Sequence, residues 1–298
     1  MSVVFNTTEP PFGPIVNGTQ IVFYHYRPNA AAGWTFVVVF GLAALVHVGF
    51  FFYLRAWRFL PLILGLIGEA FGYYGRAWAN REPNTAGPFI IQNLLILGMA
   101  PLVAATVYMT LGAFVKALDL RQYLSIPPKL TTCFYVIVDI GCFITQVFGS
   151  VMPASGDPDS IQLAKTLITG GLIAQLAALT LFLFSTMNLH RLAHRHLPSS
   201  SYDLPHMQDT RKYFFVTYGV TATMMLRSLV RGIEYLQGEE SFILKHEVFV
   251  YLFDALLIAA IAVSYMFIHP GRMLRNAQRA RSRRDKGMVE LLEPGSHR

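Results

Sequence analysis

Seven stretches of about 20 apolar residues divide this chain, and no other feature constrains its fold as strongly. A helix needs about 20 mostly apolar residues to cross the hydrocarbon core of a bilayer. Only 14% of the residues are charged, whereas a typical soluble domain has about 25%. The sequence therefore predicts an all-α membrane protein, a bundle of seven transmembrane helices. The expected spans are 33–53, 59–79, 87–114, 130–152, 164–187, 213–235 and 247–268.

The distribution of Lys and Arg among the connecting segments predicts how the helices are oriented. With the N-terminus outside, the inner connections and the C-terminal segment hold 17 of the 24 basic residues, and the outer segments hold four. Membrane proteins carry an excess of Lys and Arg on the cytoplasmic side. We therefore expect an extracellular N-terminus and a cytoplasmic C-terminus. The resulting divisions are an outer segment (1–32), a seven-helix domain (33–268) and a basic cytoplasmic tail (269–298).

The two terminal segments carry signals that agree with this topology. Residues 1–32 lack the charged start, short apolar run and cleavage site of a removable signal peptide, so we expect none. Two acceptor sequons for N-glycosylation, at Asn6 and Asn17, lie in this segment. The basic residues of the tail are interpreted as a solvated topology anchor, with contact to anionic inner-leaflet lipid as the alternative.

The sequence lacks the motifs of several other classes of protein. Cys133 and Cys142 are nine residues apart, which puts them on opposite faces of one helix, so they do not pair with each other. No spacing of His, Cys and carboxylates matches a metal site, and no phosphate loop, nucleophile elbow or dinucleotide fingerprint occurs. His47 is interpreted as a packed histidine, and the histidines of 190–206 as part of a solvated basic surface. We expect no metal, no cofactor, no catalytic residue and no nucleic-acid partner.

Polar residues recur at an interval of seven in four of the apolar stretches. Residues seven apart lie within about 20° of the same helix face. A charge in hydrocarbon costs about 2.5–3.5 kcal/mol or more, so these stripes are expected to face the interior of the bundle. The pairs are Glu69 and Arg76, Asp139 and Gln146, Arg227 and Glu234, and Glu247 and Asp254. Candidate residues beside them are Tyr73, Gln92, Tyr108, Gln175, Arg231 and Tyr251.

The depths of these residues predict a polar cavity that opens towards the outer face. Arg76, Gln146, Glu234 and Glu247 come near the outer ends of their helices, and the other members of the four pairs lie deeper. The alternative is that these charges form interhelical ion pairs that only fix the packing, and Arg231 with Glu234 has the i,i+3 spacing of such a pair. Five acids and three arginines leave two acids in excess, which favours a cationic head group if all are ionised.

Several motifs, in order, resemble the fungal RTA-like family of seven-span membrane proteins, also called lipid-translocating exporters. The resemblance extends over about residues 25–270. The motifs are Glu69-Ala-Phe-Gly-Tyr-Tyr-Gly-Arg76; Gln92 followed by Pro101 and Tyr108; Asp139 with Gln146 and Gly149; Gly171 with Gln175; Arg227-x3-Arg231-x2-Glu234; Glu247-x3-Tyr251-x2-Asp254; and His269-Pro270-Gly271.

The resemblance implies a fungal origin, a place in the plasma membrane or another cellular membrane, and export or flop of sphingoid long-chain bases. Related members are linked to resistance to toxic amphiphiles and to porphyrin movement. A cationic sphingoid amine would suit the predicted acidic cavity. The leading hypothesis is thus a transporter of lipids or amphiphiles, whose partners are membrane lipids and its amphiphilic substrate. A seven-span receptor or sensor and an intramembrane lipid-modifying enzyme are the alternatives, and the sequence leaves the oligomeric state open.

Overall fold

Long antiparallel helices dominate the structure, a computed structural model that describes residues 3–4, 9–16, 19–20, 22–124, 127–151, 158–196, 210–237 and 242–276. The first six long helices are α1 (Ala30–Leu54), α2 (Leu60–Ala79), α3 (Ala86–Leu118), α4 (Pro128–Val151), α5 (Pro158–His196) and α7 (Thr210–Gln237). The last part of the bundle comprises α8 (Phe242–Lys245), α9 (Val248–Val250), the π-helix η5 (Tyr251–Ala255) and α10 (Leu256–Phe267). Short 3₁₀ turns, η1 (Trp57–Phe59) and η2 (Arg121–Tyr123), follow α1 and α3.

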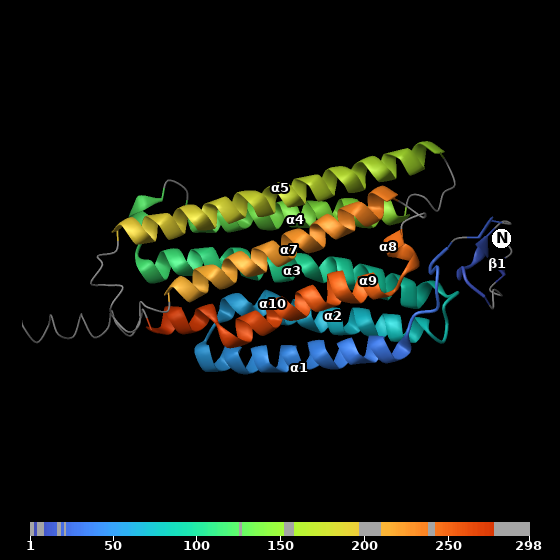
Figure 1. Ribbon diagram of the computed structural model, residues 1–298, viewed down its shortest axis with the longest axis horizontal. Helices are drawn as coiled ribbons and strands as arrows, with labels where there is room; N and C mark the ends of the chain where they lie inside the picture. The colour runs from blue at the N-terminus through green and yellow to red at the C-terminus, as the bar shows by residue number, and fades with distance from the viewer. Residues whose placement is uncertain are drawn as a thin grey trace, which may run out of the picture.

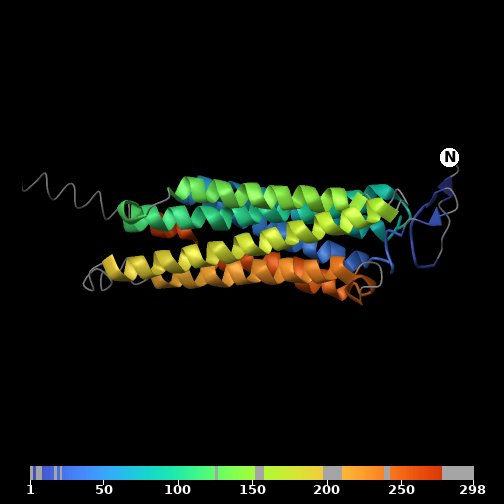
Figure 2. The ribbon, with the colours of Figure 1, turned by 90° about the horizontal axis from the view of Figure 1, so that it is seen from above.

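These helices run alternately up and down and pack side by side (Figure 1, Figure 2). Each consecutive pair from α1 to α5 is in contact, α5 contacts α7, and α10 contacts both α7 and α1. The α3 helix also contacts α5 and α7. Accordingly 61% of the apolar span of α3 is buried, against 22–39% in the other four helices with such spans. α3 is the central helix of the bundle, and its neighbours position their polar stripes around it.

Within the described residues, five helices are long and apolar enough to cross a membrane: α1, α3, α4, α5 and the segment Val248–Asn276. Their outward faces carry large apolar side chains, such as the exposed Leu45, Ile137 and Ile173. Many large apolar side chains exposed on long apolar helices fit the hydrocarbon of a bilayer. The chain is therefore a mostly helical integral membrane protein that crosses the bilayer several times. α2 and α7 hold buried charges; α2 matches the stretch predicted at 59–79, and α7, with 28 residues, contains the stretch predicted at 213–235.

A small antiparallel sheet lies beyond the end of the bundle where α1 begins (Figure 1). It is formed by β1 (Val3–Val4), β2 (Ile15–Val16) and β3 (Thr19–Gln20). Sequence analysis does not anticipate these strands, because each has only two residues. Phe12 and Tyr24 pack on Ala79, at the end of α2, and Phe23 stacks on Phe89 of α3. The N-terminal segment is therefore attached to the bundle. Both predicted glycosylation sites, Asn6 and Asn17, lie outside the described residues.

The contact between α1 and α2 depends on a small residue. A Cβ atom at Gly33 would lie 2.9 Å from both the backbone nitrogen and the Cβ of Ala77. Backbone atoms in a helix cannot move aside as a flexible side chain does. By contrast, Gly41 on the same helix has nothing within 4 Å of such an atom.

We therefore expect Gly33→Ala to destabilise the protein by about 1–3 kcal/mol, the usual cost of overpacking. Gly41→Ala is the matched control and should be neutral or slightly stabilising, because Ala favours helix more than Gly does. Thermal unfolding of the purified protein in detergent measures both effects. Equal unfolding midpoints for the two variants would show that the α1–α2 contact yields easily.

Candidate functional site

The four polar stripes face the interior of the bundle, as the sequence analysis predicts. Each of the buried members is at most 9% exposed, so lipid does not contact it. Whether these residues bind a ligand stays a prediction. The buried candidates are Glu69, Tyr73, Arg76, Gln92, Tyr108, Asp139, Gln146, Arg227, Glu234 and Asp254. Gln175, Arg231, Glu247 and Tyr251 are partly buried.

Two arginines of α7 converge on Asp254 of η5. Arg227 pairs with Oδ1 of Asp254 through its Nε. Arg231 donates from Nη2 to Oδ2 of the same carboxylate at 2.6 Å, and its Nη1 lies 3.3 Å from Glu234. The i,i+3 pair that the sequence suggests is thus present. We call Glu69, Arg227, Arg231, Glu234 and Asp254 the Asp254 cluster.

A local change of helix type positions Asp254. The chain from Tyr251 to Ala255 forms a π-helix between two α-helical segments, α9 and α10. Such π-helical turns are rare and occur frequently at functional sites. Periodicity in the sequence gives no sign of it, because a single wider turn displaces the stripe only slightly.

Glu69 is the unusual member of the Asp254 cluster. It is fully buried on α2, and neither of its carboxyl oxygens has a hydrogen-bond partner among the described residues. It lies within electrostatic range of Asp254, Arg227 and Arg231. The hydroxyl of Tyr73, four residues further along the same helix, is also buried and has no hydrogen-bond partner in the part of the chain that the structure describes. Such groups are rare in proteins and require an explanation.

A second group of charges lies nearer the end of the bundle that carries the N-terminal segment. Arg76 is 1% exposed and lies 3.2 Å from Oε1 of Glu247. Its Nε donates to the Tyr251 hydroxyl at 3.1 Å, and its Nη2 donates to the Tyr26 hydroxyl at 2.6 Å. The backbone N–H of Asn29 donates to the same Glu247 oxygen at 2.8 Å. Tyr26 and Asn29, which lie just before α1, thus add hydrogen bonds to the Arg76–Glu247 ion pair.

Tyr24 adds a further contact between the N-terminal segment and the candidate residues. Its hydroxyl donates to Oε1 of Gln92 on α3 at 3.3 Å. Burial raises the pKa of Tyr24, so this hydroxyl stays a hydrogen-bond donor. Sequence reasoning missed Tyr24, Tyr26 and Asn29, since nothing in a polar N-terminal segment signals where it docks.

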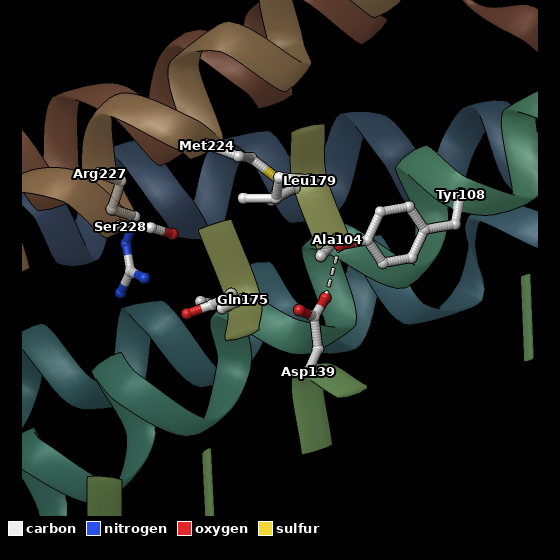
Figure 3. A pocket seen from close by; sticks show the side chains of 9 residues that line it. Ala104, Tyr108, Asp139, Gln175, Leu179, Met224, Arg227 and Ser228 are labelled. Atoms are coloured by element: carbon white, nitrogen blue, oxygen red, sulfur yellow. Dashed lines mark hydrogen bonds between the residues drawn. The ribbon is translucent and has the colours of Figure 1, made fainter. Parts of the chain in front are cut away.

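The third group surrounds Asp139 of α4. The hydroxyl of Tyr108 on α3 donates to Oδ2 of Asp139 at 2.8 Å, whereas Oδ1 makes no hydrogen bond of normal geometry with a described residue. Figure 3 shows Asp139, Gln175 and Arg227 around one small cavity. The cavity has a volume of about 10 Å³, room for about one water molecule. It is lined by Ala100, Ala104, Tyr108, Asp139, Gln175, Leu179, Met224, Arg227 and Ser228.

The structure divides the candidate residues into these three groups, whereas sequence analysis predicts one polar cavity open to the outer face. Most of the charges neutralise one another across helices, and the cavity beside Asp139 lies among four helices. Arg76, Arg227 and Arg231 each contact an acid, so ion pairs of the kind that the structural alternative describes are present. Arg227 belongs to two groups, since it pairs with Asp254 and also lines the cavity.

The histidines expected on a solvated surface differ among themselves. His190 stacks on Phe214 with ring centroids 4.4 Å apart, and its Nδ1 is 2.9 Å from the Tyr218 hydroxyl. His194 is exposed, and His206 lies outside the described residues. His47 is fully buried with Nε2 3.1 Å from the Ala262 carbonyl, as expected for a packed histidine.

Fold and interior together define a multi-pass helical membrane protein with a charged core. The family described as RTA1 like protein matches residues 62–277, and the chain belongs to this family. The match begins within α2, so the N-terminal segment and α1 precede it.

Three relatives from Saccharomyces cerevisiae are similar to the chain over most of its length. Protoporphyrin uptake protein 1 is 28% identical, over 82% of this chain and 90% of the relative. Protein RTA1 is 25% identical, over 83% of this chain and 84% of the relative. Sphingoid long-chain base transporter RSB1 is 22% identical, over 82% and 72%. No solved structure matches the chain.

The contacts of Asp254 predict that its replacement destabilises the protein. Asp254→Asn removes the negative charge that two buried arginines share, and breaking a buried ion pair in this way costs about 3–5 kcal/mol. The control is Asp139→Asn, whose side chain still accepts the hydrogen bond from Tyr108. Unfolding midpoints in detergent should fall far more for Asp254→Asn. A similar small loss for both would mean that the arginines find other partners.

Proposed function

We propose that this protein translocates amphiphiles with a cationic head group across the membrane, and that Asp139 accepts the head group. The observation that carries the proposal is the charge balance of the interior. Asp254, Glu234 and Glu247 each contact an arginine, whereas Asp139 contacts no cationic side chain among the described residues. A buried carboxylate without a cation attracts one from outside.

The surroundings of Asp139 suit an amphiphile. Its cavity is lined by polar residues, Tyr108, Gln175, Arg227 and Ser228, and by apolar ones such as Leu179 and Met224. Because the cavity holds only about one water molecule, a head group enters when the helices separate. The lining residues come from α3, α4, α5 and α7, so relative movement of these helices would open the site.

The relatives support the general activity and differ in cargo. One is named a sphingoid long-chain base transporter, and a long-chain base carries an amine that is cationic at neutral pH. Another is named for protoporphyrin uptake, and protoporphyrin carries carboxylates. Every arginine of the charged core contacts an acid here, which favours a cationic cargo. Sphingoid long-chain bases are the substrate class we propose, and the plasma membrane is the proposed location.

The decisive experiment is transfer of labelled sphingosine between the leaflets of liposomes that contain the purified protein. We expect the wild type to transfer unaltered sphingosine, and Asp139→Asn to lower the rate at least about tenfold, because it removes the proposed partner of the amine. Asp119→Asn is the matched control: the same change at an exposed residue after α3, where Asn tolerates the left-handed backbone. Equal transfer by wild type and Asp139→Asn would reject this site.

The same assay separates the other classes of protein. Binding of sphingosine without transfer would indicate a receptor, and a chemically altered product would indicate an enzyme.

We also propose that seven helices span the membrane, with α2 and α7 completing the five apolar ones and with the N-terminus outside. The excess of basic residues in the inner connections supports this orientation. Expressed in eukaryotic cells, the wild type should then carry glycans at Asn6 or Asn17, and the double replacement Asn6→Gln, Asn17→Gln should remove them. Labelling of a single cysteine added after residue 290 from the cytoplasmic side only would agree. Labelling of that cysteine from outside would refute the orientation.

A further inference from the structure

The Asp254 cluster is electrically neutral only when Glu69 carries a proton. Arg227 and Arg231 contribute two positive charges, and their partners Asp254 and Glu234 contribute two negative charges. An ionised Glu69 would leave one uncompensated negative charge in a fully buried position. Its oxygens have no hydrogen-bond donor among the described residues to stabilise that charge.

The groups that face Glu69 come from three elements. Asp254 of η5 and Arg227 and Arg231 of α7 lie within electrostatic range of its carboxyl group. Tyr73, on the same helix, lies within electrostatic range of Glu69. Phe36 and Phe40 of α1 pack on the ring of Tyr73 and bring no charge. Arg227 and Arg231, which already pair with other acids, thus lie near the carboxyl group of Glu69, which has no ion-pair partner among the described residues.

Arg227 links this carboxyl to the proposed head-group site. It lines the cavity beside Asp139, pairs with Asp254, and donates from Nη2 to the Ile96 carbonyl of α3 at 3.1 Å. A cation that enters the cavity repels Arg227 and raises the local potential. In a medium of low dielectric constant this effect is strong, and it favours loss of a proton from a nearby acid.

We infer that Glu69 holds an exchangeable proton, and that a cationic head group binding at Asp139 drives its release, so that the protein exchanges protons for cationic amphiphiles. The inference rests on the proposed function. One positive charge enters the interior as one leaves, so the net charge of the bundle is unchanged. The proton passes from the Glu69 carboxyl to water, which leaves the carboxylate beside Arg227 and Arg231.

Tyr73 indicates the direction in which the proton leaves. Its hydroxyl is the next polar group along α2 towards Arg76, and its ring lies 6.1 Å from that of Tyr251. The Tyr251 hydroxyl donates to Glu247 at 2.9 Å, and the Glu247 side chain is 18% exposed. These side chains follow one another from Glu69 towards the end of the bundle where the N-terminal segment docks, although no hydrogen bond among the described residues joins the Tyr73 hydroxyl to its neighbours.

The test uses dodecyltrimethylammonium, a probe whose fixed charge cannot itself carry a proton. Proteoliposomes with an acidic lumen and a clamped membrane potential are given the labelled probe outside. A one-for-one exchange accumulates it inside by up to about tenfold per pH unit of gradient. We expect the wild type and Asp119→Asn to accumulate the probe, Glu69→Gln to equilibrate it without accumulation, and Asp139→Asn not to move it.

Different outcomes reject different claims. Accumulation by Glu69→Gln equal to that of the wild type, or wild-type movement that ignores the pH gradient, would overturn the exchange and leave the proposed function intact. No movement of the probe or of sphingosine by the wild type would overturn both.

A second measurement does not depend on transport. The infrared spectrum of the wild type should contain the carbonyl band of a protonated carboxylic acid, which Glu69→Gln removes and Glu69→Asp shifts. Absence of any band that depends on residue 69 would show that Glu69 is ionised, and would overturn the inference.

Discussion

Pairing of charges inside an apolar bundle is the constraint on which the rest of this structure depends. Asp254 receives one arginine on each carboxylate oxygen, and both arginines come from α7. Because unpaired charges are so costly in a medium of low dielectric constant, these contacts fix the rotation of α7 against η5. Arg227 extends the constraint to α3 through the Ile96 carbonyl. A single carboxylate thereby sets the arrangement of three elements that are far apart in the sequence.

Much of this arrangement follows from periodicity. Apolar stretches of about 20 residues locate the long helices to within a few residues, apart from α5, which extends to Pro158–His196. The interval of seven identifies the faces that turn inward, because a charge on the outer face would meet hydrocarbon. The i,i+3 contact of Arg231 with Glu234 is local and is therefore readable as well. The excess of two acids can also be counted from the sequence, because the count does not depend on which residues form ion pairs.

The sequence does not reveal which residues of different helices form ion pairs with one another. Arg76 and Glu247 are 171 residues apart, and a stripe specifies a direction but not the helix it meets. For this reason the stripes suggest one open cavity, whereas the structure contains three groups of residues. The π-helix that presents Asp254 and the docking of Tyr26 on Arg76 depend equally on tertiary contacts. The two acids in excess can be named, as Glu69 and Asp139, only once every arginine has been assigned.

These two acids have different surroundings, and the difference separates two roles. Asp139 adjoins a cavity and accepts a hydrogen bond from Tyr108 on one oxygen, so a ligand in the cavity can approach the other oxygen. Glu69 accepts no hydrogen bond from the described residues and does not line that cavity, so the smallest cation, a proton, is the one it can accept without rearrangement. A bundle with one acid for the cargo and another for the proton keeps the same net charge in its interior in both states. Arg227, which borders both, makes the occupancy of each site sensitive to the other.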